Sequence, residues 1–473
     1  MHEPSLPVVV IVGRPNVGKS TLFNVLTRTR DALVADFPGV TRDRQYGIGR
    51  VGEQPYVLVD TGGLVGGATG IEALTSRQVL NAIDEADLLL FVVDAKDGLS
   101  GADEEISVQL RRYNLPIIVA VNKTENQAEE ISDAEFSALG FESSVSISAA
   151  HRRGMTSLMG AVFAALPPAA EPAEGTEQEL EGIIKLAVLG RPNVGKSTLV
   201  NRLLGEERVL AFDEPGTTRD TISVPLERQG QQYLLLDTAG VRRRSKISET
   251  IEKFSVIKAL QAIESCHVVI LMMDASEGMT DQDATLLGHI LGRGRALVIA
   301  MNKWDHLDED HRKRVLSELD RKLEYATFAR RITLSALHGS GIRELMKAVN
   351  EAYTSATRDF STSEVTRVLI DAFERHQPPL RQGRTAKLRY AHSGGKLPPR
   401  IVIHGNRTGS LSQDYKRYLV NRFVSHFKLR GTPLFLEFRD SKNPYKGKRN
   451  KLTARQLEKR RRLKKHVKSK SRK

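Results

Sequence analysis

Internal repetition constrains this chain more than any other feature of its sequence. The nine residues GRPNVGKST occupy positions 13–21 and return unchanged at 190–198, an offset of 177. Three further blocks return in the same order: FPGVTRD as EPGTTRD (37–43, 214–220), DTGG as DTAG (60–63, 237–240) and VNK as MNK (121–123, 301–303), the last with an offset of 180. Such ordered repetition predicts a duplicated domain.

The segments around these blocks predict an α/β fold. Apolar runs at 8–13, 56–60, 87–94, 116–123 and 144–148 read as strands, and the second copy repeats them at 183–190, 233–237, 267–274, 296–303 and 331–335. Helical stretches lie between them, the first starting near Lys19. Near-continuous apolar strands alternating with helices are typical of a mostly parallel sheet that is covered on both faces. We therefore predict P-loop domains at 1–166 and 183–357.

The remaining segments divide into a linker, a small module and a tail. Residues 167–182 contain five glutamates and no aromatic or β-branched apolar residue, which predicts an acidic flexible linker. Residues 358–441 predict a small α/β module, with helices at 365–377 and 412–427 and strands at 386–393, 400–406 and 433–441. Residues 442–473 are too charged to fold alone, and we expect them to be disordered in the free protein.

Charge is distributed very unevenly along the chain. Residues 442–473 hold 16 Lys/Arg and one acidic residue, and residues 358–441 hold 16 basic and seven acidic residues. Of the total of +14, these segments contribute +15 and +9, which leaves −10 for residues 1–357. A basic end on a chain whose remainder is net acidic predicts contact with a polyanion. For the tail taken alone, a merely solvated charge run stays an alternative.

Cysteine usage and apolar run lengths indicate the compartment. Cys266 is the only cysteine and precedes an apolar run, so we expect it to fill a core rather than form a disulfide. The sequence shows no basic leader with a signal-peptide core, and no apolar run approaches the roughly 20 residues of a membrane span. We predict a cytoplasmic protein that is monomeric when free.

The repeated nine-residue block predicts a phosphate-binding loop. Glycines let backbone N–H groups turn toward phosphate oxygens, and the following helix presents its positive end. In this pattern the lysine reaches the β- and γ-phosphates and the serine hydroxyl binds Mg²⁺. The residues concerned are Gly13, Gly18, Lys19, Ser20 and Thr21, and Gly190, Gly195, Lys196, Ser197 and Thr198. A tight turn without a ligand is the alternative, and two copies between a strand and a helix disfavour it.

The next two blocks predict Mg²⁺ and γ-phosphate contacts. Asp60 and Asp237 end apolar strands, where their carboxylates can hold the Mg²⁺ shell through water. Gly63 and Gly240 allow a backbone N–H to meet a γ-phosphate, and Thr41 and Thr218 are candidate switch hydroxyls for Mg²⁺. An ordinary loop threonine is the alternative for each of these two. Leu64 and Val241 stand where many GTPases place a water-orienting glutamine, so we expect hydrolysis to need another contribution.

The NK blocks predict recognition of guanine. In NKWD, the carboxylate of Asp305 can accept from guanine N1–H and the 2-amino group together, a donor pair that adenine lacks. The second site thus comprises Asn302, Lys303 and Asp305, and the first comprises Asn122, Lys123 and Glu125. Because glutamate adds a methylene, we expect weaker guanine affinity at the first site. Ser148 with Ala149, and Ser335 with Ala336, are predicted to offer a backbone N–H to guanine O6.

Asn16 and Asn193 within the loops suggest where the missing catalytic help comes from. Each asparagine can help to hold a monovalent cation against the phosphates, where the cation acts like an arginine finger. We therefore predict that potassium stimulates hydrolysis.

Taken together, the tandem GRPNVGKST loops, the acidic linker and the small basic module resemble the EngA family of bacterial double GTPases, also called Der, over essentially the whole chain. The resemblance implies two Era-like GTPase domains, a KH-like C-terminal domain, and a role in assembling the large ribosomal subunit through contacts with ribosomal RNA. It assigns the nucleotide roles given above to the same residues. The family usually has Asp at the position of Glu125. Residues 358–441 contain no GxxG, so RNA clamping of the usual KH kind is not expected.

Three classes of function remain after this reading. The first is a GTP-controlled RNA-binding assembly factor, of which a tRNA-modifying GTPase is a near relative. The second is a kinase or ATPase, against which NKWD argues, and the third is a GTPase held at a membrane surface by its tail. The tail lacks an amphipathic apolar face, which disfavours lipid. In the second switch region, Arg242, Arg243 and Arg244 are expected to support ribosome association.

Overall fold

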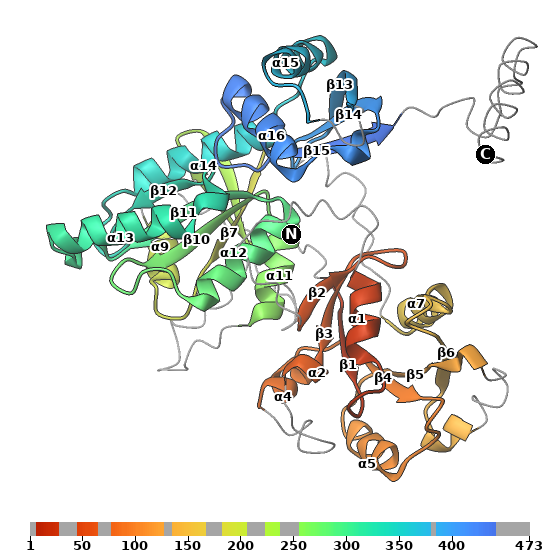
Figure 1. The fold of residues 1–473 in the computed structure, drawn as a ribbon. Helices are drawn as coiled ribbons and strands as arrows, with labels where there is room; N and C mark the ends of the chain where they lie inside the picture. Colours follow the sequence, from red (N-terminus) through yellow and green to blue (C-terminus); the bar gives the residue numbers. More distant parts are fainter. Residues whose placement is uncertain are drawn as a thin grey trace, which may run out of the picture.

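The first repeat folds as a six-stranded sheet (Figure 1, red to orange). Its strand order is β2-β3-β1-β4-β5-β6, and all neighbours are parallel except β2 and β3. The strands are β1 (Val8–Val12), β2 (Tyr46–Gly49), β3 (Tyr56–Asp60), β4 (Leu88–Asp94), β5 (Ile117–Asn122) and β6 (Ser143–Ser146). The computed structural model describes residues 6–27, 45–64, 77–126, 135–166, 182–205, 223–236, 255–379 and 385–440.

Helices cover both faces of this sheet. They are α1 (Lys19–Thr27), α2 (Thr61–Leu64), α4 (Arg77–Asp84), α5 (Gly101–Leu110) and α7 (Met155–Ala165). Alternate residues of β1 enter different cores: Val9 and Ile11 pack with α1 and α7, and Val8 and Val10 pack with α4 and α5. Burial of both faces explains why these strands read as continuous apolar runs rather than alternating ones.

The second repeat has the same design (Figure 1, yellow-green to turquoise). Its sheet has the order β12-β11-β10-β7-β9-β8, with only β8 antiparallel to its neighbour. The strands are β7 (Ile184–Leu189), β8 (Val224–Arg228), β9 (Gln231–Leu236), β10 (Val268–Asp274), β11 (Ala296–Asn302) and β12 (Arg330–Thr333). The helices are α9 (Lys196–Gly205), α11 (Val256–Ser265), α12 (Asp281–Arg293), α13 (Glu309–Lys322) and α14 (Ile342–Thr357). Cys266 is fully buried in one of its two cores, as predicted.

The C-terminal module packs two helices on one face of a three-stranded sheet. Its elements are α15 (Thr362–Arg375), β13 (Lys387–Gly395), β14 (Arg400–Asn406), α16 (Gln413–Phe427) and β15 (Phe435–Asp440). β13 and β14 are antiparallel, and β14 and β15 are parallel. Residues such as Leu369, Ile403 and Phe423 form its core.

The strands predicted from sequence are confirmed to within three residues at each end, as are both helices of the C-terminal module. The sequence analysis missed β2 and β8. Both are short strands at a sheet edge, and β2 reads YGIG, so neither presents the apolar run that reveals a central strand.

The C-terminal module is joined to the second GTPase-like sheet through Gly431. Its carbonyl accepts from the N–H of Leu297 at 2.7 Å, and its N–H donates to the carbonyl of Phe328 at 2.8 Å. Gly431 has a φ of +69°, and a Cβ there would lie 2.4 Å from the Cβ of Ala352 on α14. Only glycine permits this approach, which fixes the module against the end of the second sheet.

Helix α11 contacts both repeats. Ala259, Ala262 and Ile263 belong to a core of the second repeat, while Ile257 and Leu260 pack into a core of the first. Polar contacts support the packing of α11 against the first repeat. Ser255 Oγ donates to Glu85 at 2.5 Å, and Gln261 Nε2 donates to the carbonyl of Leu6 at 2.7 Å. α11 is therefore a shared element between the two domains.

Several predictions fall outside the described residues. They concern the switch threonines Thr41 and Thr218, the strand-end residues Asp237 and Gly240, Val241, the arginines 242–244, the linker at 167–181 and the tail at 442–473. Within the described ranges, no helix is long and apolar enough to cross a membrane.

Candidate nucleotide-binding sites

Both phosphate loops lie between the end of a central strand and the start of a helix. In the first loop, Lys19 Nζ donates to the carbonyls of Gly13 and Arg14, each at 2.7 Å. Lys19 is buried, which lowers the pKa of its ammonium group, and the nearby Asp60 carboxylate opposes this shift. In the second loop, Lys196 Nζ donates to the carbonyl of Arg191 at 2.8 Å. In each loop, backbone carbonyls thus hold the lysine ammonium group by hydrogen bonds.

The loop glycines are required by close contacts. A Cβ on Gly13 would lie 2.3 Å from the carbonyl oxygen of Val92, and one on Gly18 would lie 2.3 Å from Nδ2 of Asn122. The second loop repeats these conflicts at Gly190 and Gly195, with distances of 2.4 and 2.2 Å. All four glycines also have φ between +100° and +153°. Larger residues would therefore push the loop off the strand behind it.

Asn122 and Asn302 connect the phosphate loop to the loop that follows the next strand. Asn122 Nδ2 donates to the carbonyl of Val17 at 2.8 Å, and its Oδ1 accepts from the N–H of Ala149 at 3.0 Å. Asn302 makes the same two bonds, to Val194 at 2.7 Å and from Ala336 at 2.9 Å. Each asparagine is buried, so its amide braces two loops rather than projecting into open space.

This bracing involves the N–H groups that are predicted to bind guanine O6. The N–H groups of Ala149 and Ala336 donate to the asparagines, and those of Ser148 and Ser335 donate to the carbonyls of Arg153 and Ser340 at 3.2 and 3.1 Å. All four N–H groups therefore have protein partners in this structure, and their role toward guanine O6 stays a prediction. The side chain of Ser148 instead contacts the first-site carboxylate, since its Oγ donates to Glu125 Oε2 at 2.9 Å.

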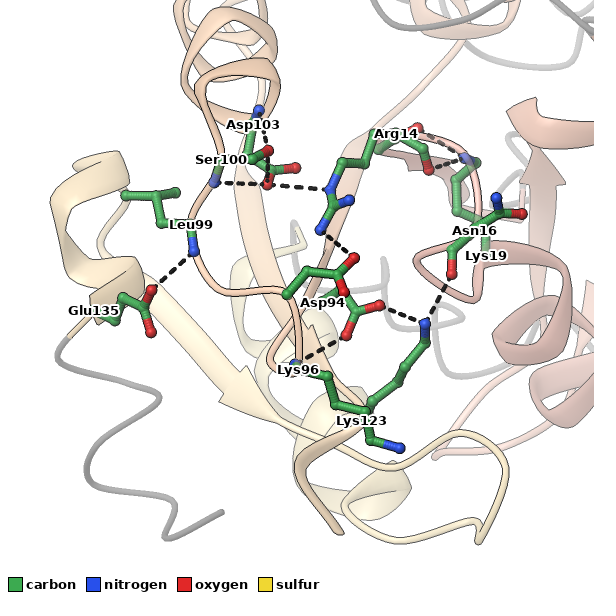
Figure 2. A network of polar contacts seen from close by, with 12 residues as sticks. Arg14, Asn16, Lys19, Asp94, Lys96, Leu99, Ser100, Asp103, Lys123 and Glu135 are labelled. Atoms are coloured by element: carbon green, nitrogen blue, oxygen red, sulfur yellow. Dashed lines mark hydrogen bonds and ion pairs between the residues drawn. The ribbon is translucent and has the colours of Figure 1, made fainter. Parts of the chain in front are cut away.

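Two buried aspartates that the sequence analysis missed hold the NK lysines. Lys123 pairs with Asp94 and donates to the carbonyl of Asn16 at 2.9 Å (Figure 2). Lys303 pairs with Asp274 at 2.5 Å. Both lysines have positive φ, 69° and 60°. The sequence contained a signal for these two aspartates. Asp94 and Asp274 end corresponding apolar runs, and their offset of 180 is the same as that of the NK blocks.

An arginine in each loop was also missed. Arg14 pairs with Asp97 at 3.1 Å and with Asp103 at 3.3 Å, and Figure 2 shows Asp103 at the start of α5 bonded to Ser100. The second loop repeats this arrangement with Arg191, which pairs with Glu277 at 2.8 Å and Asp283 at 3.1 Å. Asp103 and Asp283 are fully buried capping-box residues. Each loop is thus tied to the cap of a neighbouring helix.

The carboxylates that are predicted to bind guanine, Glu125 and Asp305, have different neighbours in the two copies. Glu125 accepts from Lys96 Nζ at 2.9 Å and from Ser148 Oγ at 2.9 Å, and these two hydrogen bonds lower the pKa of Glu125 to about 2. Asp305 lies 3.4 Å from His338 and 3.6 Å from His306. Desolvation raises the pKa of Asp305, but hydrogen bonds, chiefly from Ser335, outweigh it and leave that pKa lowered. Both groups are therefore carboxylates at neutral pH.

The first site also fits a Mg²⁺ ion. Asp60 is buried at the end of β3, and its Oδ1 accepts from the N–H of Gly62 at 2.9 Å, which leaves carboxylate lone pairs for a hydrated cation. Ser20 lies exposed at the start of α1. The described residues contain no group of three His, Cys, Asp or Glu side chains placed for a metal. These residues fit an ion that nucleotide phosphates help to hold.

Comparison with known proteins defines the family. A family model described as "50S ribosome-binding GTPase" matches residues 8–123 and again 185–303. A second, described as "KH-domain-like of EngA bacterial GTPase enzymes, C-terminal", matches residues 360–439. The chain is 56% identical to GTPase Der of Thioalkalivibrio sulfidiphilus, over 98% of this chain and 100% of that protein. It is 54% identical to GTPase Der of Methylococcus capsulatus, over 98% and 99%. The chain belongs to the GTPase Der (EngA) family.

Membership in the Der family gives the chemistry of the two loops. The chain is a GTPase, and a GTPase binds GTP or GDP together with Mg²⁺. Among solved structures, Era in complex with MgGDPNP and a segment of 16S ribosomal RNA is 22% identical and covers 55% of this chain and 93% of that chain. Its TM-score is 0.28, too low to bear on fold or function.

Proposed function

We propose that this Der-family GTPase is a molecular switch that binds ribosomal RNA in precursors of the large ribosomal subunit and acts late in their assembly. The observation that carries the proposal is that one chain combines two nucleotide sites, in which equivalent residues make the same hydrogen bonds, with a basic C-terminal quarter. The printed description of the matching family, a 50S ribosome-binding GTPase, and the KH-like match at 360–439 support the same partner.

The proposed division of the chain follows the sequence pattern. It places GTPase domains at 1–166 and 183–357, a linker at 167–182, the KH-like domain at 358–441 and a tail at 442–473. Lys19, Ser20 and Asp60 serve the phosphates and Mg²⁺ in the first site, with Lys196 and Ser197 in the second, and Asp305 reads guanine. The switch roles of Thr41, Thr218, Asp237 and Gly240 belong to the same proposal. Nucleotide exchange would shift the domains between states of different affinity for the ribosomal particle.

Potassium stimulation is part of this proposal. Asn16 and Asn193 lie exposed in the loops with φ of 65° each, a left-handed conformation that the loop turn imposes. The amide oxygen of each is proposed to hold K⁺ beside the phosphates. The test is the GTP hydrolysis rate in potassium and in sodium buffer, for the native protein and for the Asn16→Ala, Asn193→Ala double variant. Equal rates in both buffers for the native protein would remove this part.

Sedimentation tests the main proposal. Cell extract is run on a gradient with GTP, GDP or a non-hydrolysable GTP analogue, and the protein is located by immunoblot. We expect co-migration with the large subunit or its precursors in the triphosphate state and release with GDP. Attachment that is indifferent to the nucleotide contradicts a switch, and attachment to liposomes rather than ribosomal particles would favour the membrane-surface class.

A further inference from the structure

A cleft of about 840 Å³ opens between the second GTPase domain and the KH-like domain, away from both nucleotide sites. One wall is the side of α14 that carries Arg343, Lys347, Asn350 and Thr354, which recur every three or four residues and so share one helix face. The turn between β8 and β9 and the last residues of α16 complete the lining. Figure 1 shows α14 and α16 side by side at this junction.

The lining carries a strong excess of positive charge. Six cationic residues and one acidic residue line the cleft, a formal net charge of +5 with histidine neutral. The cations are Arg228, Arg343, Lys347, Arg358, Lys428 and Arg430. The acidic residue, Glu351, accepts from Arg330 at 2.9 Å and lies 3.7 Å from Arg430, so its charge is already compensated. The second GTPase domain contributes three of these cations, Arg228, Arg343 and Lys347.

The walls of the cleft are held in place by short-range structure. Gln229 and Gly230 both have positive φ, 51° and 76°, as in the two-residue turns that join antiparallel strands, and this turn sets Arg228 at the rim. Tyr233 Oη bonds to Asn350 Oδ1 at 2.8 Å and ties the hairpin to α14. Arg358 Nη1 donates to the carbonyl of Phe427 at 2.6 Å and lies over that ring. These contacts keep like charges close together without a ligand.

The composition of the lining selects the ligand chemistry. Pockets for small molecules are mostly apolar and aromatic. Here the rings of Tyr233 and Phe427 are buried, so their faces are not open for stacking a base, and His426 is the one exposed ring among six cations. The cations instead come from three segments in two domains, more than one phosphate group can contact. We propose that this cleft binds the phosphodiester backbone of one RNA segment of the ribosomal precursor, an inference that rests on the proposed function and locates the contact outside the tail.

Two exposed cations on α14 provide the test. The double variant Arg343→Ala, Lys347→Ala removes two charges from the rim and touches no residue of either nucleotide site. The matched control, Lys313→Ala, Arg314→Ala, removes two exposed charges from α13 of the same domain, outside the cleft lining. A third variant, Arg343→Lys, Lys347→Arg, retains both charges. The probes are a labelled single-stranded oligoribonucleotide and purified large-subunit particles, titrated across a range of KCl concentrations.

For single strands, log K falls with log salt by about 0.7 for each neutralised phosphate, so two lost contacts should reduce the slope by about 1.4. Extrapolated from 1 M to 0.1 M salt, this slope corresponds to about 25-fold weaker binding. We expect this loss for the alanine variant only, with GTP hydrolysis unchanged. Inorganic polyphosphate is then added as a competitor. If the cleft recognises phosphate alone, polyphosphate should displace the oligoribonucleotide from native protein, and its own log K should fall with log salt with the same slope.

The outcomes separate this inference from the proposed function. If native protein binds particles in a nucleotide-dependent way and the α14 variant keeps its affinity and salt slope, the cleft is not the contact and the switch proposal stands. Equal losses in the α14 and α13 variants would mean that only long-range charge acts, which also overturns the cleft. Saturable binding of polyphosphate with no binding of RNA would assign the cleft to a free polyanion and overturn the RNA ligand. Absence of any RNA or particle binding by native protein overturns both.

Discussion

The two GTPase domains have the same residues in their phosphate loops. They differ in the residues before β4 and β10 and in the surroundings of the helices α4 and α11. Asp87 and His267 occupy corresponding positions before β4 and β10. Each accepts from a backbone N–H near the start of the neighbouring strand, Asp87 from Val8 of β1 at 2.8 Å and His267 from Lys185 of β7 at 3.2 Å. Leu80 on α4 is 37% exposed, whereas its counterpart Leu260 on α11 is 1% exposed. The duplicated domains kept identical phosphate-loop residues, and the second copy differs where its helix α11 packs against the first copy.

The largest difference that mutation can reveal concerns the loop lysines. Lys19→Ala and Lys196→Ala each remove the ammonium group that is proposed to contact the phosphates, and we expect hydrolysis at the altered site to fall by about 100-fold or more. Single-turnover GTP hydrolysis of each single variant then reports the rate of the remaining site. The double variant is the control and should be inactive. Unchanged turnover in either single variant would show that its site does not contribute.

The helix comparison predicts a large asymmetry in stability. Leu260→Ala should lower the free energy of unfolding by about 2–5 kcal/mol, because it empties a core position shared by both domains. Leu80→Ala on α4 should cost less than about 1 kcal/mol, because part of its surface stays in water. Urea unfolding followed by circular dichroism measures both. Similar losses in the two variants would contradict the bridging role of α11.

The guanine-site carboxylates predict a smaller, reciprocal effect. Glu125→Asp should tighten GDP binding at the first site, and Asp305→Glu should weaken it at the second, each by about 10-fold, the equivalent of one charge-assisted hydrogen bond. Titration of a fluorescent GDP into Lys196→Ala or Lys19→Ala backgrounds isolates each site. If Glu125→Asp binds no better than native protein, the bonds of Glu125 to Lys96 and Ser148 are not what limits its access to guanine.

The last difference between the two copies concerns pH. Burial, with Lys185 and Arg295 nearby, lowers the pKa of His267 to about 4, below its usual value of 6.5. Because the unfolded chain takes up this proton more readily, stability is present above pH 6.5 and is lost as pH falls toward 4. Urea midpoints at pH 7 and 5 should differ for native protein. His267→Asn, which keeps an acceptor for Lys185 N–H, should reduce that difference; an equal pH effect in both would assign it to other groups.

Prediction from sequence reached furthest where a pattern is repeated or continuous. The duplicated blocks located the two loops, and apolar runs located the central strands, because both depend on local residue order. The edge strands β2 and β8 were missed, since an edge needs little apolar pattern to pair. The bracing roles of Asn122 and Asp94 were missed as well, because their partners, Val17 and Lys123, are identified only once the loops lie beside each other.

The sequence by itself determined that the chain has two GTP sites and a basic C-terminal quarter, because those properties follow from residue identity and spacing. Only the tertiary structure decided that α11 joins the two domains and that cations of α14, the β8–β9 turn and α16 converge on one cleft. These residues lie up to about 200 positions apart in the sequence. Their proximity depends on packing between domains, and a helix in sequence shows its apolar and charged faces without showing what each face will meet.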